Sequence, residues 1–91
     1  MFTSLTLTGG AAQLLWGYRT AAHVGAWRIK KSDVDGRWTL TATLTRIDAF
    51  QLRQTPLLFT APRPGGFWCW PVTSLQVGTS QLVATLGPPE Q

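Results

Sequence analysis

The sequence predicts an all-β domain: a small antiparallel sheet of about seven strands, curled into a barrel or folded into a sandwich, with little or no helix. Three observations support this prediction. Apolar and polar residues alternate in short runs, turn-forming residues recur about every 8–12 positions, and no helical periodicity extends beyond about two turns. Together they favour short strands joined by tight turns.

Length and composition fit one domain. The chain has 91 residues, enough for one hydrophobic core, so we expect a single β domain over residues 1–91 with residues 87–91 as a frayed tail. Hydrophobic residues make up 44% and charged residues 13%, a balance too apolar for a disordered chain. Five tryptophans are many for this length, and tryptophan side chains are mostly buried or used at interfaces.

The clearest strand spans residues 37–45. Its apolar residues alternate without exception with arginine and threonine, and it contains neither glycine nor proline. The apolar members are Trp38, Leu40, Ala42 and Leu44. Alternation sends them all to one face of a sheet, so the opposite face is a row of threonines, which we interpret as solvated rather than as a binding face.

The strands before it follow from the same alternation. Residues 2–8 predict a first strand that ends at the following glycine pair. Residues 12–20 predict a second strand, in which Gly17 indicates a bulge or a close backbone approach. A short helix over residues 10–15 is the alternative for the start of this segment.

Residues 22–31 predict a third strand that has apolar residues on both faces. One face carries Trp27 and Ile29, and the other carries Val24, Ala26, Arg28 and Lys30. Residues 32–36 have turn chemistry, with Asp at the entry and Gly where a positive φ is expected. The long strand therefore folds back on residues 26–31 as a hairpin.

The alternation breaks after the long strand. Near residues 46–48 a bulge or a bend is the simplest interpretation, after which Phe50 and Leu52 resume the strand pattern. Residues 57–59 predict a short buried strand. Residues 61–66 predict the clearest loop of the chain, because prolines stiffen it and glycines let it reverse.

Two further strands complete the domain. Residues 67–72 are apolar on both faces, and Pro71, which lacks an N–H, places this strand at an edge or at a change of pairing partner. Residues 74–77 continue it, residues 78–80 predict a turn, and residues 81–86 predict the last strand.

No arrangement of residues predicts catalysis. His23 and Cys69 are the only histidine and cysteine, but Cys69 lies between two tryptophans, where we expect a buried and unreactive thiol. Asp33 and Asp35 have backbone reasons to occupy a turn, which argues against an acid–base pair with Asp48. We therefore expect no enzyme and no small-molecule substrate.

Metal and phosphate motifs are incomplete. The Asp33-x-Asp35-Gly36 pattern would need a bidentate acid at the position of Leu44 to hold calcium. Zinc needs several Cys or His ligands, where the chain has one of each. The glycine-rich segment lacks the lysine and the following helix of a phosphate-binding loop. We expect no metal and no cofactor.

The net charge favours an anionic partner. Eight Lys and Arg residues against four Asp and Glu residues give +4, and small β-barrels bind single strands through basic grooves with aromatic stacking platforms. The residues that we expect to contact nucleic acid are Arg28, Lys30, Lys31 and Arg37, which form one basic cluster at the end of the predicted hairpin, with help from Arg63. The leading hypothesis is a non-enzymatic module that contacts nucleic acid or a nucleoprotein complex. The alternative is that these residues only keep a tryptophan-rich domain soluble.

Phe67, Trp68 and Trp70 favour a second hypothesis, a protein-interaction module. They follow a stiff loop, and a strand that is apolar on both faces is typical of an oligomer seam or of an edge that pairs with another chain. The partner is then another protein or a second copy. The alternative is a core strand that is covered on both sides.

Targeting signals are not evident in the sequence. The first ten residues lack the basic segment and long apolar core of a signal peptide, and no apolar run approaches the roughly 18 residues of a membrane span. A single cysteine excludes an internal disulfide. We expect a soluble intracellular protein without membrane contact.

Three segments of the second half are PLLF at residues 56–59, FWCWPV at residues 67–72 and LGPPE at residues 86–90. They resemble stretches of small uncharacterised proteins of bacteriophages and other mobile elements, and none is a motif with an assigned chemistry. The resemblance implies an accessory protein in a bacterial cytoplasm that binds host nucleoprotein machinery, nucleic acid or copies of itself. Under the second hypothesis, residues 67–70 would serve an inhibitor of a host complex, such as a defence system, or a self-assembling phage structural protein.

Overall fold

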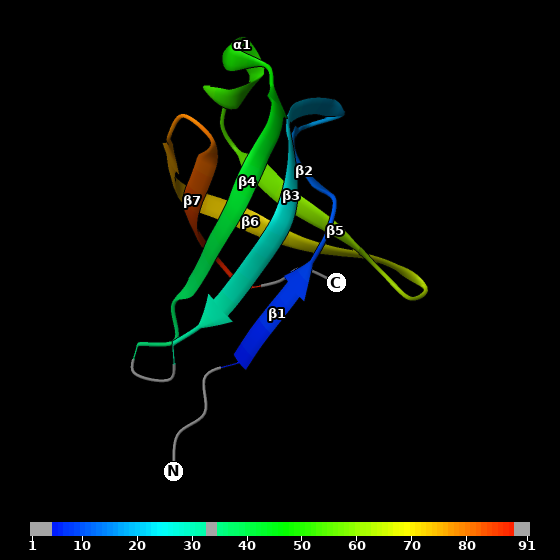
Figure 1. Cartoon of the computed structure of the whole chain (residues 1–91), viewed down its shortest axis with the longest axis vertical. Helices are drawn as coiled ribbons and strands as arrows, with labels where there is room; N and C mark the ends of the chain where they lie inside the picture. Colours follow the sequence, from blue (N-terminus) through cyan, green and yellow to red (C-terminus); the bar gives the residue numbers. More distant parts are fainter. Residues whose placement is uncertain (1–4, 33–34, 89–91) are drawn as a thin grey trace.

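The computed structural model describes residues 5–32 and 35–88 as a nearly all-β protein (Figure 1). Its elements are β1 (Leu5–Gly9), β2 (Ala12–Trp16), β3 (Arg19–Lys31), β4 (Trp38–Ile47), α1 (Ala49–Leu52), β5 (Leu57–Arg63), β6 (Gly66–Val77) and β7 (Gln81–Leu86). The predicted first strand over residues 2–8 lies partly outside the described residues, as do the predicted tail beyond residue 88 and Asp33.

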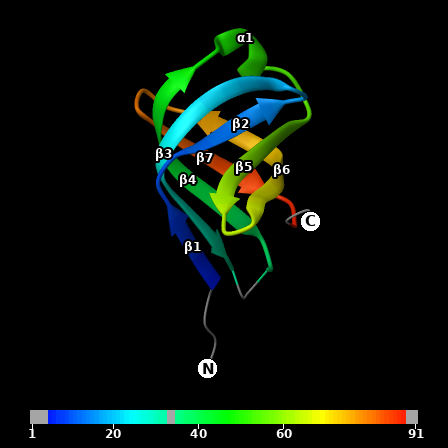
Figure 2. The same cartoon turned by 90° about the vertical axis from the view of Figure 1, so that its right-hand side faces the viewer.

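The strands form a small antiparallel barrel, which confirms the predicted fold class. The order along the sheet is β1-β3-β2-β5-β6-β7-β4, and an additional pairing between β3 and β4 closes the ring of six strands, β2 to β7. Within the described residues β1 pairs only with β3 and therefore lies outside this ring. Figures 1 and 2 show β1 extending below the barrel, at the end opposite α1.

Strand β3 organises the N-terminal half. Its first part pairs with β2 and its second part with β1, so β1 and β2 lie end to end along the same edge of β3. The registers Ala12↔Val24 and Gly9↔Trp27 leave Gly10 and Ala11 as the break between them. Only β2 continues the barrel, because β5 pairs with β2 and not with β1.

A bulge at Ala26 reverses the alternation within β3. The residue has φ +46°, and Ala26 and Trp27 together lie opposite the single residue Ala42 of β4. The extra residue moves the following side chains to the other face, so Val24, Trp27 and Ile29 are all buried. The prediction that Val24 lies opposite Trp27 and Ile29 is wrong for this reason.

Strand β4 has the predicted alternation. Trp38, Leu40 and Ala42 are buried and the threonines between them are exposed. The predicted hairpin with residues 26–31 is confirmed by the register Lys31↔Trp38 to Arg28↔Thr41. Two of the threonines also join the strands where the ladder is irregular, since the hydroxyls of Thr43 and Thr45 donate to backbone oxygens of β3 at 2.8 and 3.0 Å.

The prediction that Phe50 and Leu52 resume the strand pattern is wrong. The chain forms the single helical turn α1 after Asp48. The Asp48 carboxylate accepts from the backbone N–H groups of Phe50 and Gln51, both at 3.1 Å, which is N-cap geometry. An Asp at the end of a strand was the available signal for this helix start.

Two predicted turns differ in detail. Gly17 has φ +61° and forms the β2–β3 turn with the fully exposed Tyr18, where we expected a bulge inside one strand. Residues 61–63 belong to β5, so the predicted loop reduces to the two-residue turn of Pro64 and Gly65. Gly65 has φ +82°, the positive φ that a type II turn requires at its third residue, and the proline before it is common at the second.

Pro71 marks a change of pairing partner, one of the two alternatives that we predicted. Strand β6 pairs with β5 over residues 66–72 and with β7 from Val72 to Val77. The lack of an N–H is tolerated there because one ladder ends as the other begins. The turn after residue 77 and the last strand are also confirmed, with the Gly78 N–H donating to the Gln81 oxygen at 2.8 Å.

Aromatic rings fill the centre of the barrel around the fully buried Trp70. Ring centroids of Phe59, Trp38 and Trp68 lie 5.8, 6.3 and 5.5 Å from the centroid of Trp70, and Trp27 packs edge-on against Phe59 at 5.6 Å. Such contacts add to the area that the rings bury. The stability of the fold therefore depends on packing inside the ring of strands.

Candidate functional site

Arg28 and Lys30 lie on the outer face of β3. After the bulge, Trp27 and Ile29 point inward, so the residues that alternate with them point outward. The register places Arg28 between Thr8 of β1 and Thr41 of β4, and Lys30 between Thr6 and Thr39. We call this surface the cationic face. It consists of Arg28, Lys30, Thr6, Thr8, Thr39 and Thr41, all of which are exposed.

The cationic face carries no carboxylate. Strands β1, β3, β4 and β7 contain no Asp or Glu, and the acidic residues that the structure describes, Asp35 and Asp48, lie beyond the two ends of β4. Threonine hydroxyls flank both cations, so the surface offers hydrogen-bond donors around two positive charges. Phosphate oxygens accept hydrogen bonds from both kinds of donor.

Lys31 and Arg37 do not join this face, although we predicted one basic cluster. Lys31 follows the inward alternation, and its ammonium lies over the Trp38 ring, 5.3 Å from the centroid. Arg37 lies 4.0 Å from the carboxylate of Asp35. The backbone N–H of Arg37, which donates to Asp35 at 2.9 Å, lowers the pKa of that carboxyl and keeps it charged. The positive charge of Arg37 is therefore partly offset.

Arg63 is separated from the other predicted cations. It lies at the tip of the β5–β6 hairpin, which Figure 1 shows projecting away from the β3–β4 turn. Its guanidinium covers the Trp68 ring, 4.5 Å from the centroid. Such a cation–π contact stabilises the hairpin tip by about 0.5–1 kcal/mol at an exposed site.

Phe67, Trp68 and Trp70 occupy three different environments. Phe67 points outward and is 70% exposed, Trp68 is half-buried under the guanidinium, and Trp70 is 0% exposed. Alternation along β6 separates Phe67 from its neighbour, and the core encloses Trp70. The prediction of Trp70 as a partner-binding residue is wrong, because its ring is already covered by Phe59, Trp38 and Trp68.

The His23–Cys69 pair that we considered does not form. His23, Gln13, Thr60 and Cys69 occupy one row across four neighbouring strands, so three inter-strand spacings, about 14 Å measured along the sheet, separate the backbones of His23 and Cys69. Asp35 and Asp48 lie beyond opposite ends of β4. In the described part of the chain, no group of three or more His, Cys, Asp or Glu side chains gathers to hold a metal.

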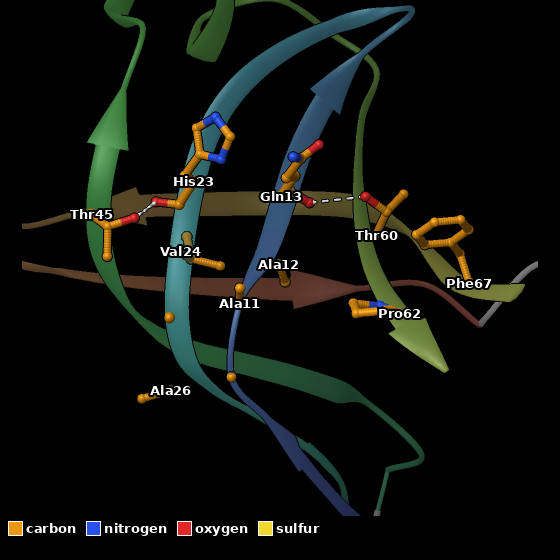
Figure 3. A pocket seen from close by; sticks show the side chains of 12 residues that line it. Ala11, Ala12, Gln13, His23, Val24, Ala26, Thr45, Thr60, Pro62 and Phe67 are labelled. Carbon is orange, nitrogen blue, oxygen red and sulfur yellow. Dashed lines mark hydrogen bonds between the residues drawn. The ribbon is translucent and has the colours of Figure 1, made fainter. Parts of the chain in front are cut away.

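A groove on the outer face of β3, β2 and β5 was missed by sequence reasoning (Figure 3). Its volume is about 640 Å³. It is lined chiefly by residues with small or no side chains at its floor and by polar and aromatic residues at its sides: Gly10, Ala11, Gly25, Ala26, Gln13, His23, Thr45, Thr60, Pro62 and Phe67. Two Gly-Ala steps were the available signal, but only the register brings them together.

Comparisons of the chain with protein-family models, with curated proteins and with solved structures find no match. Among residues 5–32 and 35–88, no helix is long and apolar enough to span a membrane.

Proposed function

We propose that this protein binds nucleic acid, alone or within a nucleoprotein complex, through the cationic face. The observation that supports the proposal most directly is the position of Arg28 and Lys30 between two rows of exposed threonines on strands without a carboxylate. Basic side chains supply the salt-dependent part of the affinity for phosphates, and hydroxyls and backbone groups fix the position of the backbone.

The charge pattern fits a sequence-tolerant contact. Arg28 and Lys30 are two residues apart on one strand, so their side chains emerge about 6.6 Å from each other on the same face. Lys31 lies at the adjacent barrel end, over Trp38. No hydrogen bond or ion pair within the described residues engages the charged end of Arg28 or Lys30. Both cations are thus available to a phosphate backbone.

A salt titration tests the proposal. Binding of a fluorescently labelled oligonucleotide, followed by anisotropy, should weaken linearly on a log–log plot against salt concentration. The variant Arg28→Gln/Lys30→Gln should lower the magnitude of the slope by about 1.4, from two phosphate contacts at about 0.7 each for a single strand.

The matched control removes the same charge elsewhere. Arg19 begins β3 and Arg53 is the C-cap residue of α1, and Figure 2 shows α1 and the β2–β3 connection at the end of the barrel opposite β1. Arg19→Gln/Arg53→Gln should leave the slope nearly unchanged. Equal losses in the two double variants would show that net charge alone drives binding. No binding by the unsubstituted protein at low salt would contradict direct contact with nucleic acid.

A second candidate function is a protein-interaction module, such as an inhibitor of a host complex or a self-assembling structural protein. It is favoured by the exposed Phe67 and by the first half of β6, residues 66–70, which within the described residues pairs with β5 alone. An unpaired strand edge is a template for another chain. If copies of this chain associate there, sedimentation velocity should show a concentration-dependent dimer that Phe67→Ala weakens. A monomer at all concentrations excludes the self-assembling form.

A further inference from the structure

We infer that the outer groove receives one unpaired nucleobase of a single strand whose phosphates lie on the cationic face. The inference rests on the proposed function and specifies its ligand as single-stranded rather than duplex. It assigns a role to Phe67 that differs from the protein contact considered above.

The groove exists because two neighbouring strands have only glycine and alanine at the same level of the sheet. Gly10 and Ala11 form the break between β1 and β2, and Gly25 and Ala26 form the bulge of β3 beside it. The registers Gly9↔Trp27 and Ala12↔Val24 bracket both irregularities. The result is a depression in the outer surface of the barrel.

The two sides of the groove offer the contacts that a base needs. On the β5–β6 side, Phe67 presents an exposed ring beside Pro62 (Figure 3). On the other side lie Gln13 and His23, whose side chains make no hydrogen bond within the described residues. Every base has a π-face for stacking, and its edges combine donors and acceptors that an amide or an imidazole can pair.

The walls are held in place by the neighbouring strands. The Thr60 hydroxyl donates to the backbone oxygen of Gln13 at 3.4 Å, and the Thr45 hydroxyl donates to that of His23 at 3.0 Å (Figure 3). Backbone groups at the groove are therefore engaged, while the side chains of Gln13 and His23 are left for a ligand. The volume of about 640 Å³ lies within the range of small-molecule sites, so one base fits.

Charge complementarity favours a nucleotide over an apolar peptide side chain as the occupant. Along the outer face of β3, Gly25 of the groove is followed by Arg28 and Lys30 of the cationic face. None of the lining residues carries a carboxylate. A single strand can place one planar base in the groove and its flanking phosphates on the cationic face at the same time. A duplex does not, because its bases are stacked and paired and cannot enter a groove singly.

The test compares Phe67→Leu with a matched control, Phe50→Leu. Phe50 is 66% exposed and lies on α1, at the end of the barrel away from β1. Leucine keeps an apolar side chain but removes the ring. Anisotropy titrations would use a 12-residue single-stranded DNA and the matching duplex. A second oligonucleotide would carry 2-aminopurine, whose fluorescence falls when it stacks.

We expect the unsubstituted protein to bind the single strand more tightly than the duplex and to quench 2-aminopurine. Phe67→Leu should weaken single-strand binding by about 5- to 150-fold, the effect of losing one base–aromatic stack, and should abolish the quenching. Phe50→Leu should change neither. Gln13→Leu, which removes the amide, should alter the preference among homopolymers of different base.

Three results would overturn the inference: duplex bound as tightly as single strand, no quenching by the unsubstituted protein, or unchanged affinity in Phe67→Leu. Nucleic-acid binding by the cationic face is tested by a separate pair of variants. If Arg28→Gln/Lys30→Gln lowers the salt slope while Phe67→Leu has no effect, the cationic face binds nucleic acid and the groove does not. If no oligonucleotide binds at low salt, both proposals fail.

Discussion

The inner and outer faces of the barrel wall are built from alternate residues of the same strands, yet they have opposite chemistry. In β4 the inward residues Trp38 and Leu40 are buried, while Thr39 and Thr41 between them are exposed. The inner face is a packed aromatic core, and the outer face is polar, cationic and free of carboxylates on β1, β3, β4 and β7. The contrast indicates that substitutions on the inner face should change stability, whereas substitutions on the outer face should leave stability nearly unchanged.

The largest difference in effect is expected between Trp70 and Phe67, because both are aromatic residues of β6 but only Trp70 is buried. Trp70→Ala should lower the free energy of unfolding by about 3–5 kcal/mol, since it removes a fully buried ring and leaves a cavity among Phe59, Trp38 and Trp68. Phe67→Ala should change it by less than about 0.5 kcal/mol, because the ring is mostly exposed. Urea unfolding followed by circular dichroism measures both.

A further variant tests whether packing is the reason. The indole N–H of Trp70 has no hydrogen-bond partner within the described residues, so Trp70→Phe removes ring volume without breaking a hydrogen bond. It should be less damaging than Trp70→Ala. A Phe67→Ala variant as unstable as Trp70→Ala would show that the outer ring contributes to the core and that the two faces are not separable.

The second prediction concerns Gly9 and Gly10, where β1 leaves the barrel. A Cβ on Gly9 would lie 2.4–2.6 Å from atoms of the Trp27 indole, whereas a Cβ on Gly10 meets nothing within 4 Å. Gly9→Ala should lower the free energy of unfolding by about 1–3 kcal/mol, since a buried ring must shift. Gly10→Ala should be neutral or slightly stabilising. Equal effects in thermal unfolding would contradict the close contact between β1 and Trp27.

The parts of the fold that followed from sequence are those set by local chemistry. The period of two over residues 37–45 placed Trp38 and Leu40 inside. The missing N–H of Pro71 predicted either an edge position or a change of pairing partner, and β6 shows the second. The helix start at Asp48 was also encoded locally, but the short length of α1 left no periodicity to accompany the cap.

The parts that did not follow depend on contacts between strands. The positive φ of Ala26 has no local signature, since alanine rarely adopts it, so the inversion of β3 appears only when β4 is alongside. The sequence predicts one cluster of consecutive basic residues, but Lys31 points to the opposite face from Lys30. The groove likewise requires the Gly-Ala steps of two strands to be in register.

The third prediction tests the point where the alternation of β4 ends. Asp48→Ala should lower the free energy of unfolding by about 1 kcal/mol, because the N–H groups of Phe50 and Gln51 lose their acceptor. Asp48→Asn keeps an acceptor oxygen and should cost only a few tenths of a kcal/mol. Chemical denaturation of the two variants measures the difference. If both lose the same stability, the carboxylate charge and not the cap geometry matters there.

The smallest expected effect on stability is at Asp35, in the turn between β3 and β4. The Arg37 N–H lowers the pKa of the Asp35 carboxyl in the folded protein, so this group contributes stability that is present above the ordinary Asp pKa and is lost as pH falls through the lowered value. Titration by NMR should place Asp35 below its ordinary value. The stability gap between the unsubstituted protein and Asp35→Asn should be open at pH 7 and close in strong acid. Because the side chain is exposed, solvent screens the interaction, and a gap that persists in acid would show that a neutral hydrogen bond, rather than the charge, holds the turn.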